Sequence, residues 1–195
     1  VYYREKLLIS VKIKIAGVHN VYNSLAVTAA INEAGIALNK ISPYFSNFSG
    51  MGRRFQKVCE SEGIQIFDDY AHHPTEIKAT LDAAALKFGK QNIVAVFQPH
   101  RYTRLKSLWD EFKTSFGGAD RIIVTDIYAA SEDPIDGISA DKFASELNNA
   151  EYIGGSMKDV AERLLPTLDK GNIVIGLGAG TITELGKYFQ KLTLV

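Results

Sequence analysis

The sequence predicts an α/β protein built on a doubly wound, mostly parallel sheet, preceded by a shorter segment of another kind. From residue 53 onward, short apolar runs alternate with longer stretches of helical periodicity, which is typical of a sheet covered by helices. Residues 93–97 (IVAVF) are apolar throughout, as a strand must be when both faces of its sheet are buried. Ligands of such folds bind at the carboxyl ends of the strands, so we examine the turns that follow them.

Residues 51–195 are expected to form one complete domain. Its predicted strands are short apolar runs at residues 64–67, 92–97, 121–125 and 172–176, with a weaker one at 151–153. Its predicted helices have apolar residues at spacings of three and four, and they cover residues 75–88, 103–116, 139–147, 158–165 and 181–189.

Residues 1–50 are expected to form a separate unit. Residues 6–15 alternate apolar and polar side chains, which predicts a half-buried strand. Residues 21–34 have helical periodicity and end at Gly35, a plausible helix stop. The polar, glycine-bearing stretch 46–52 (SNFSGMG) is where we place the domain boundary.

Composition excludes several classes of protein. Hydrophobic residues make up 46% of the chain and charged residues 23%, so we expect an ordered globular protein. The 22 basic and 22 acidic side chains balance, which argues against a nucleic-acid partner. A single cysteine, Cys59, leaves no intramolecular disulfide and fits a reducing compartment. Without a signal sequence or an apolar run of about 18 residues, we expect a cytoplasmic protein with no membrane partner. Because the chain begins at Val1 instead of methionine, we expect either a processed protein or a fragment.

A dense polar turn follows the predicted strand 64–67. Residues 68–76 read DDYAHHPTE, and Pro74 favours an extended residue before it and a helix start after it. A capped turn explains any one of these side chains, whereas so many polar groups at one strand end indicate function. In one alternative, a group of five residues ligates a metal for hydrolysis, namely Asp68, Asp69, His72, His73 and His100.

A second turn, residues 98–104 (QPHRYTR), follows the predicted strand 92–97. Arg101 and Arg104 are three residues apart, so they share a face if both lie in the first helical turn. Cations at a helix N-terminus interact unfavourably with the helix dipole. A bound anion would offset this cost, so their presence there indicates an anion site. A pair of guanidiniums matches the two oxygens of a carboxylate or phosphate. The alternative is a solvated basic helix start.

Two further segments carry weaker signals. Residues 176–180 (GLGAG) suggest either tight packing at a strand end, which we favour, or a stand-alone nucleotide-binding module. Residues 17–23 (GVHNVYN) precede the first helix, where Asn20 is a natural N-cap. By itself His19 predicts no function, and Asn23 has an amide that could reach a purine edge.

Taken together, the motifs resemble those of the Mur ligase family. They are GVHNVYN, GRRF (52–55), DDYAHHPTE, FQPHRYTR (97–104), YAASE (128–132) and GAG (178–180), in that order. Within the family they are most similar to members that join L-alanine to UDP-N-acetylmuramate; the related murein peptide ligases are the alternative. The resemblance implies that residues 1–50 are the C-terminal remnant of a central ATP-binding domain and 51–195 the C-terminal domain. The N-terminal domain and most of the central domain would be missing partners.

The family chemistry implied is peptidoglycan precursor synthesis, with ATP and Mg forming an acyl phosphate that the amino acid attacks. Because the chain has no Gly-Lys-Thr/Ser phosphate loop, we expect it to be inactive alone and to bind no cofactor. The resemblance assigns ATP contacts to His19, Asn20, Asn23, Arg54 and Asp69. It assigns substrate contacts to Tyr70, His72, Arg101 and Arg104, with no metal ligand and no certain catalytic residue.

Overall fold

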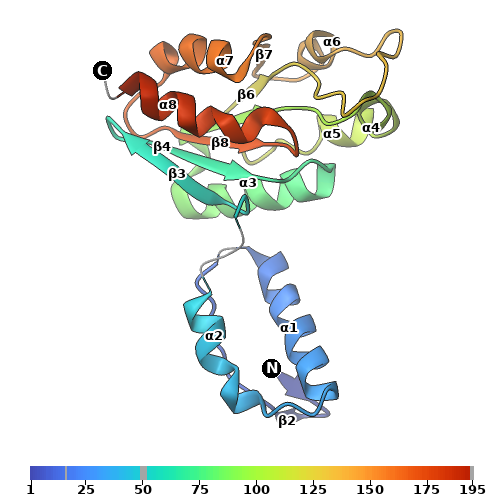
Figure 1. The fold of residues 1–195 in the computed structure, drawn as a ribbon, viewed down its shortest axis with the longest axis vertical. Coiled ribbons are helices and arrows are strands. Elements are labelled where there is room, and N and C mark those ends of the chain that lie inside the picture. Colours follow the sequence, from blue (N-terminus) through green and yellow to red (C-terminus); the bar gives the residue numbers. More distant parts are fainter. Residues whose placement is uncertain (16, 49–51, 194–195) are drawn as a thin grey trace. The chain divides into compact units, whose positions relative to one another are not determined.

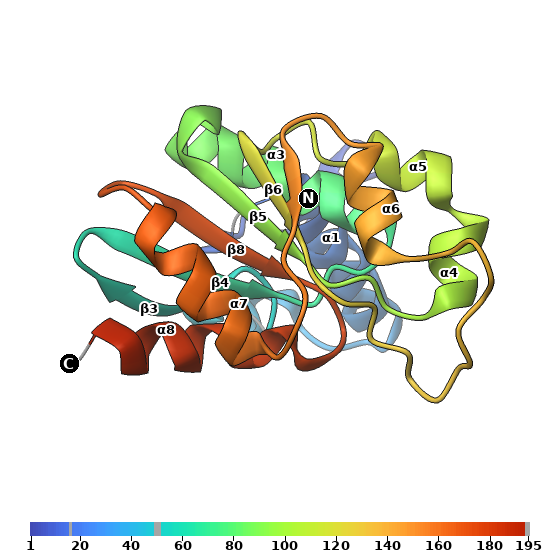
Figure 2. The same cartoon turned by 90° about the horizontal axis from the view of Figure 1, so that it is seen from above.

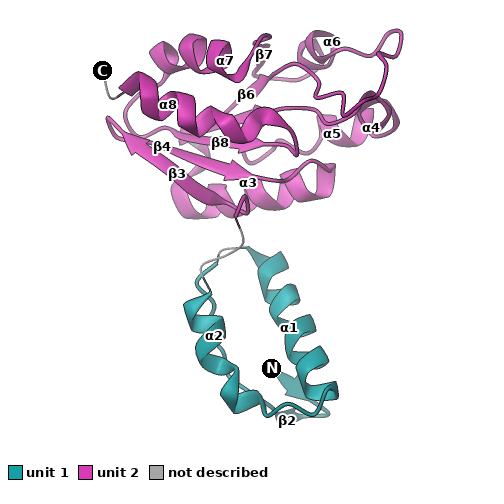
Figure 3. Ribbon diagram, in the orientation of Figure 1, with its two compact units in different colours: residues 1–51 teal, residues 52–195 magenta. Residues whose placement is uncertain are grey.

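A computed structural model describes residues 1–15, 17–48 and 52–193, which fall into two compact units. The first unit comprises residues 1–51 and the second residues 52–195 (Figure 3). No helix in these described ranges is long and apolar enough to cross a membrane.

The first unit is mostly helical (Figure 1). Its elements are β1 (Tyr2–Tyr3), β2 (Lys6–Leu7), α1 (Val18–Glu33), η1 (Leu38–Lys40) and α2 (Ser42–Asn47). The predicted strand 6–15 is therefore wrong beyond Leu7. Alternation is not sufficient for a strand, because the backbone also needs a partner, and β2 pairs only with the two residues of β1.

Helix α1 begins earlier than the sequence predicts. Gly17 is the residue before its first turn, and Asn20 lies inside that turn, where its backbone N–H donates to the Gly17 carbonyl at 3.0 Å. The prediction of Asn20 as the N-cap is therefore wrong. Gly17 has a φ of 102°, a conformation that glycine adopts without strain.

The second unit contains a six-stranded sheet with the order β3-β4-β8-β5-β6-β7. The strands are β3 (Gln56–Ser61), β4 (Ile64–Asp69), β5 (Ile93–Phe97), β6 (Arg121–Val124), β7 (Ala150–Tyr152) and β8 (Ile173–Leu177). All neighbours are parallel except β3 and β4. The predicted α/β fold with a mostly parallel sheet is confirmed.

Strand β3 is the element that the sequence analysis missed. Residues 56–61 (QKVCES) are mostly polar and exposed, so they give no apolar run. The tight turn into β4 has Glu62 at φ 53° and Gly63 at φ 81°, and two positive φ values are what a type I′ hairpin requires. The Glu-Gly pair was thus the one local signal of this hairpin.

Helices cover both faces of the sheet, as Figures 1 and 2 show. One face packs against α3 (Pro74–Phe88), α4 (Tyr102–Ser107), α5 (Trp109–Lys113) and α6 (Ala140–Ser145), and the other against α7 (Met157–Leu164) and α8 (Leu185–Thr193). Short 3-10 turns complete the unit: η2 (Lys90–Asn92), η3 (Leu165–Thr167) and η4 (Thr181–Glu184). Within β5, Ala95 and Phe97 lie in the first cluster and Val94 and Val96 in the second. This alternation explains why β5 is apolar at every position.

The predicted helix 103–116 is broken into α4 and α5. The break lies at Leu108, whose φ is −116°. Just before it, the Ser107 hydroxyl donates to the Thr103 carbonyl at 2.8 Å, a back-bond that often bends helices. The predicted helix 181–189 likewise begins as the 3-10 turn η4 before α8.

The order of the strands makes neighbouring connections diverge at the carboxyl edge of the sheet. Strand β8 lies between β4 and β5. The chain leaves β4 into α3 on one face, whereas it leaves β8 toward α8 on the other face. Ligands of open α/β sheets bind outside the strand ends at the point where neighbouring connections diverge in this way, so we take this edge as the candidate site.

We predict that Phe97→Ala strongly destabilises the second unit. Phe97 is fully buried, and its ring centroid lies 5.3 Å from both Phe112 and Phe116. Its removal leaves a cavity, and the free energy of unfolding should fall by about 3–5 kcal/mol, measured by urea denaturation. The control is Leu86→Ala, since Leu86 is 91% exposed; its effect should stay within about 0.5 kcal/mol. Equal effects would contradict the assignment of Phe97 to the core.

Candidate functional site

The turns after β4, β5 and β6 bring four rings into a continuous row at the carboxyl edge of the sheet. We call Tyr70, His72, His100 and Tyr128 the ring row. The centroids of Tyr70 and His72 are 5.1 Å apart, those of His72 and His100 are 5.8 Å apart, and those of His100 and Tyr128 are 5.5 Å apart. Tyr70 and Tyr128 are each 37% exposed, so the row remains available to a ligand. The two turns that the sequence singled out therefore do lie together.

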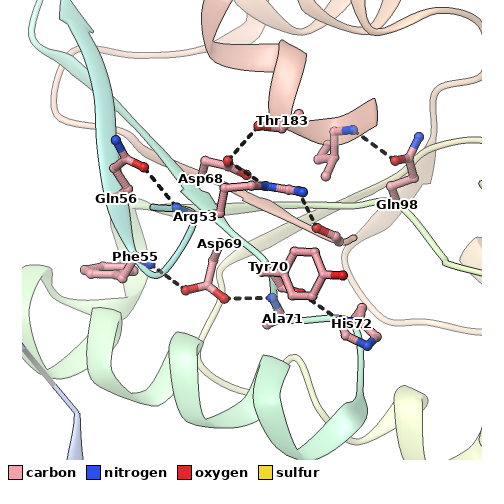
Figure 4. A network of polar contacts seen from close by, with 12 residues as sticks. Arg53, Phe55, Gln56, Asp68, Asp69, Tyr70, Ala71, His72, Gln98 and Thr183 are labelled. Carbon is pink, nitrogen blue, oxygen red and sulfur yellow. Dashed lines mark hydrogen bonds and ion pairs between the residues drawn. The ribbon is translucent and has the colours of Figure 1, made fainter. Parts of the chain in front are cut away.

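Asp69 fastens the turn after β4 to the preceding segment. Its Oδ2 accepts the backbone N–H of Phe55 at 2.6 Å, and its Oδ1 accepts that of Ala71 at 2.8 Å (Figure 4). Burial raises the pKa of the Asp69 carboxyl, while the hydrogen bonds from Ala71 and Phe55 oppose that rise. Asp69 thus holds protein backbone in this structure, and its contact with a nucleotide stays a prediction.

Buried Asp68 forms an ion pair with partly exposed Arg53. The guanidinium Nε donates to Asp68 Oδ2 at 3.1 Å, and Nη2 donates to the Gly178 carbonyl at 2.8 Å. The Thr183 hydroxyl donates to the same Oδ2 at 2.8 Å. Figure 4 shows that these contacts tie β4 to the turn after β8. Within the described residues, Asp68 Oδ1 is buried with no hydrogen-bond partner.

Both arginines of the GRRF motif lie over the ring of Tyr70. The guanidinium carbon of Arg53 is 4.9 Å from the ring centroid, and that of exposed Arg54 is 5.5 Å away. Cations at this distance are attracted to the negative face of the ring. Sequence reasoning named Arg54 alone and missed Arg53, although the adjacent pair of arginines was visible in the motif.

The two histidines of the first turn have different environments. His72 Nδ1 lies 2.8 Å from the Tyr70 carbonyl, and since a carbonyl only accepts, this nitrogen carries the proton. The same Nδ1 lies 3.5 Å from Glu76 Oε2. His73 is the N-cap of α3 and accepts the Thr75 N–H at 3.4 Å. For His73, the alternative of a capped turn with no further function therefore holds.

Among the residues that the structure describes, the guanidiniums of Arg101 and Arg104 form no salt bridge shorter than 4.0 Å. Arg101 reaches Glu132 only at 4.0 Å, and its side chain is 50% exposed. Arg104 Nη1 lies 3.0 Å from His100 Nδ1. Because a guanidinium only donates, the His100 nitrogen accepts this bond. The pair keeps most of its donors for a ligand, as an anion-binding fork requires.

His100 is held neutral between these charges. Burial is the largest cause that lowers its pKa, followed by the positive charge of Arg104. At neutral pH the ring therefore carries its single proton on Nε2, with Nδ1 facing Arg104. A neutral ring adds no third positive charge to the fork, and it presents an N–H donor beside it.

The metal-ligand alternative does not fit this geometry. In residues 1–15, 17–48 and 52–193, no three His, Cys, Asp or Glu side chains converge as ligands. Asp68 and Asp69 already accept hydrogen bonds from Arg53 and from backbone N–H groups. The guanidiniums nearby would repel a cation.

The remaining predicted ATP contacts lie in the first unit. His19, Asn20 and Asn23 are in the first two turns of α1, where His19 Nε2 and Asn20 Nδ2 are 3.1 Å apart. Arg54 and Asp69 belong to the second unit. The five residues thus belong to two separate units, and their shared role in binding ATP stays a prediction.

Comparison with known proteins identifies the family. The sequence profile described as "Mur ligase, glutamate ligase domain" matches residues 53–180, which is most of the second unit. The chain belongs to the Mur ligase family. Its sequence is 43% identical over 195 residues to UDP-N-acetylmuramate–L-alanine ligase of Trichlorobacter lovleyi, covering 97% of this chain and 42% of that protein. The enzyme of the same name from a Sulfurihydrogenibium species is 43% identical over 186 residues, covering 93% and 40%.

Solved structures support the same family. UDP-N-acetylmuramate-alanine ligase of Thermotoga maritima superposes with a TM-score of 0.76 at 27% identity, covering 96% of this chain and 40% of that one. A murein peptide ligase of Psychrobacter arcticus gives 0.68 at 22% identity, covering 93% and 38%, a likeness that shows the fold alone. The chain thus spans about two fifths of the length of the relatives it matches.

The glycine turn of this Mur ligase domain serves packing, as predicted. A Cβ added to Gly180 would lie 2.5 Å from Tyr128 Cγ and 2.6 Å from Gln98 Oε1. A Cβ on Gly178 would lie 2.9 Å from the Gln98 carbonyl. Buried Gln98 in turn accepts the Ile182 N–H and donates to the Thr181 hydroxyl, both at 2.9 Å. The glycines therefore let the end of β8 lie against the ring row.

We predict that Gly180→Ala displaces the ring of Tyr128 from His100. The added methyl group overlaps Tyr128 at its Cβ and Cγ, which cannot swing away as a flexible chain end can. The free energy of unfolding should fall by about 1–3 kcal/mol, with changed chemical shifts at His100. Gly117→Ala is the control, since its Cβ meets nothing within 4 Å. Unchanged His100 signals in Gly180→Ala would contradict the packing role.

Proposed function

We propose that the chain is the C-terminal part of an ATP-dependent ligase that joins L-alanine to UDP-N-acetylmuramate in peptidoglycan precursor synthesis. The relatives at 43% identity carry that activity in their names. The observation that carries the proposal is the pair Arg101 and Arg104 beside a neutral histidine at the open edge of the sheet. Such a pair suits the carboxylate of an amino acid.

In the proposed reaction, a phosphoryl group passes from ATP to the muramyl carboxylate. The alanine amine then attacks the acyl carbon, and the resulting tetrahedral intermediate loses phosphate and a proton to give the amide. The task of this chain is to hold the amine near that carbon. Fixing two reactants in the right geometry lowers the barrier by up to about 7–11 kcal/mol in ideal cases.

Each turn of the site takes a role in this proposal. Arg101 and Arg104 bind the alanine carboxylate, while Tyr70 and His72 border the amino-acid pocket. The position of the ring row supports this, because the row continues from Tyr70 to the fork without a break. The side-chain N–H groups and flat rings orient the substrate and exclude water.

ATP and Mg are the proposed cofactors of the whole ligase. His19, Asn20 and Asn23 would contact the adenine, and Arg54 and Asp69 the phosphate and ribose side. Arg54 is exposed above Tyr70, which suits an anion. The acidic magnesium ligands would come from the remainder of the central domain, and the ligase would work in the cytoplasm.

A murein peptide ligase is the second candidate. Murein peptide ligases share part of the DDYAHHP turn, and the solved structure of one has the same fold as this chain. The relatives at 43% identity favour the alanine ligase, and so does the FQPHRYTR motif at residues 97–104. The two candidates differ in the acceptor amine, since one uses free alanine and the other a peptide.

We predict that the chain of 195 residues neither hydrolyses ATP nor forms the amide bond. Its sequence has no Gly-Lys-Thr/Ser phosphate loop, and that loop cradles the phosphates that must be transferred. Phosphate release and amide formation should stay at the level of a blank without protein. Turnover that survives repeated purification, and that Arg101→Ala abolishes, would contradict the prediction.

We predict that Arg101→Ala in the complete ligase raises the KM for L-alanine by about 10- to 100-fold, the equivalent of a charged hydrogen bond of about 1.5–3 kcal/mol. The KM for ATP should change little, because the lost contact is to the amino acid. Lys106→Ala, in the helix that follows Arg101, removes the same charge from an exposed position and serves as the control. Equal changes in both KM values would remove the carboxylate role.

A further inference from the structure

The loop after β6 is fastened to the turn that carries Arg101. The backbone N–H of Tyr128 donates to the Pro99 carbonyl at 2.8 Å, and that of Arg101 donates to the Tyr128 carbonyl at 2.9 Å. The rings of His100 and Tyr128 stack between these two bonds at an interplanar angle of 19°. The two segments therefore form one local structure, although they are far apart in the sequence.

Glu132 closes this structure at the first turn of α4. Its Oε2 accepts the backbone N–H of Thr103 at 3.0 Å, and its Oε1 accepts the Thr103 hydroxyl at 2.6 Å. The Thr103 N–H is one of the helix N-terminal donors that have no partner within the helix. An acidic side chain there also complements the helix dipole. Glu132 thus caps α4 from a loop 29 residues away.

The backbone on both sides of this contact is constrained. Arg101 has a φ of 72°, and Ala130 and Ser131 have φ values of 50° and 70°. Left-handed conformations of residues other than glycine persist only where surrounding contacts enforce them, and they cluster at binding sites. The backbone at Arg101 sets the direction in which its side chain leaves the turn. The bond from Thr103 to Glu132 holds the backbone two residues after Arg101.

The charge of Glu132 also lies beside the fork. Its Oε1 is 4.0 Å from Arg101 Nη1. The hydrogen bond from the Thr103 hydroxyl is the largest cause that lowers the pKa of Glu132, followed by that from the Thr103 backbone. The carboxylate therefore stays ionised at neutral pH, where it offsets part of the repulsion between Arg101 and Arg104.

We propose that Glu132 is a positioning residue for the amino-acid substrate, which fixes Arg101 for the substrate carboxylate by capping the first turn of α4 at Thr103. The inference rests on the proposed function of Arg101 and extends it to a residue that contacts no substrate. It assigns the YAASE motif, residues 128–132, the task of holding the arginine fork in place.

The test measures KM for each substrate in the complete ligase, in Glu132→Ala, Glu132→Gln and the control Asp133→Asn. Asp133 is the next residue along the loop and is exposed, so its variant removes the same charge without touching Thr103. Glu132→Ala should raise the KM for L-alanine roughly tenfold, the effect of losing one charged hydrogen bond, and leave the KM for ATP within about twofold. Glu132→Gln keeps an acceptor for the Thr103 N–H, so its KM should fall between wild type and Glu132→Ala.

A double-mutant cycle with Arg101→Ala separates positioning from general damage. If Glu132 acts through Arg101, adding Glu132→Ala to Arg101→Ala should change the KM for L-alanine less than about twofold. If Glu132 only stabilises the fold, adding Glu132→Ala to Arg101→Ala should raise the KM for L-alanine by the same factor as Glu132→Ala alone. The KM values of the other substrates should then rise as well. That result would overturn the inference. A KM for L-alanine in Glu132→Gln below that of the wild-type ligase would also overturn it.

The cycle also distinguishes two kinds of failure. If Arg101→Ala leaves the KM for L-alanine unchanged, the proposed function of the fork fails. If Arg101→Ala raises it and the Glu132 variants match Asp133→Asn, only the role of Glu132 fails. Should Glu132→Ala not fold, Glu132→Gln and its pairing with Arg101→Ala decide the same question.

Discussion

The position of β8 between β4 and β5 is the constraint on which the site depends. Leu177 at the end of β8 is in register with Asp69 on one side and Phe97 on the other. The three strands therefore end at one level, and the turns that leave β4 and β5 start from the same edge. The connections after β4 and β8 go to opposite faces, the arrangement at which open α/β sheets bind ligands. Residues far apart in sequence meet there as a consequence of strand order.

Burial divides the charged groups of this edge into two kinds. Asp68, Asp69 and Arg53 are satisfied mostly by each other, by backbone groups and by Thr183, so they hold the turns in place. Arg101 and Arg54 project with much of their surface exposed. An ionised group can serve a ligand only if its own hydrogen-bonding capacity is not already used. Because the buried charged groups hold the turns in place, the exposed arginines keep hydrogen-bond donors for a ligand.

The sequence predicted an element correctly where the residue pattern of that segment is sufficient. It failed where the structure of a segment depends on pairing with another segment. The apolar run of β5 predicts a buried central strand without any knowledge of its neighbours. Residues 6–15 alternate as a strand would, yet β1 offers only two residues to pair with. The motifs located both turns of the site. The contact between Thr103 and Glu132 joins segments 29 residues apart, and no local pattern encodes such a pairing.

Strand β3 was not predicted because its sequence is polar, and that polarity also has a physical consequence for the protein. It lies at the edge of the sheet, and its outer backbone groups are the kind that recruit strands from other molecules. Its sequence is polar, with an ion pair between Lys57 and Glu60 on the exposed strand. Charges on an edge discourage intermolecular sheet extension, since a second strand would have to desolvate them. The features that hide β3 from hydrophobicity patterns also protect the protein from aggregation.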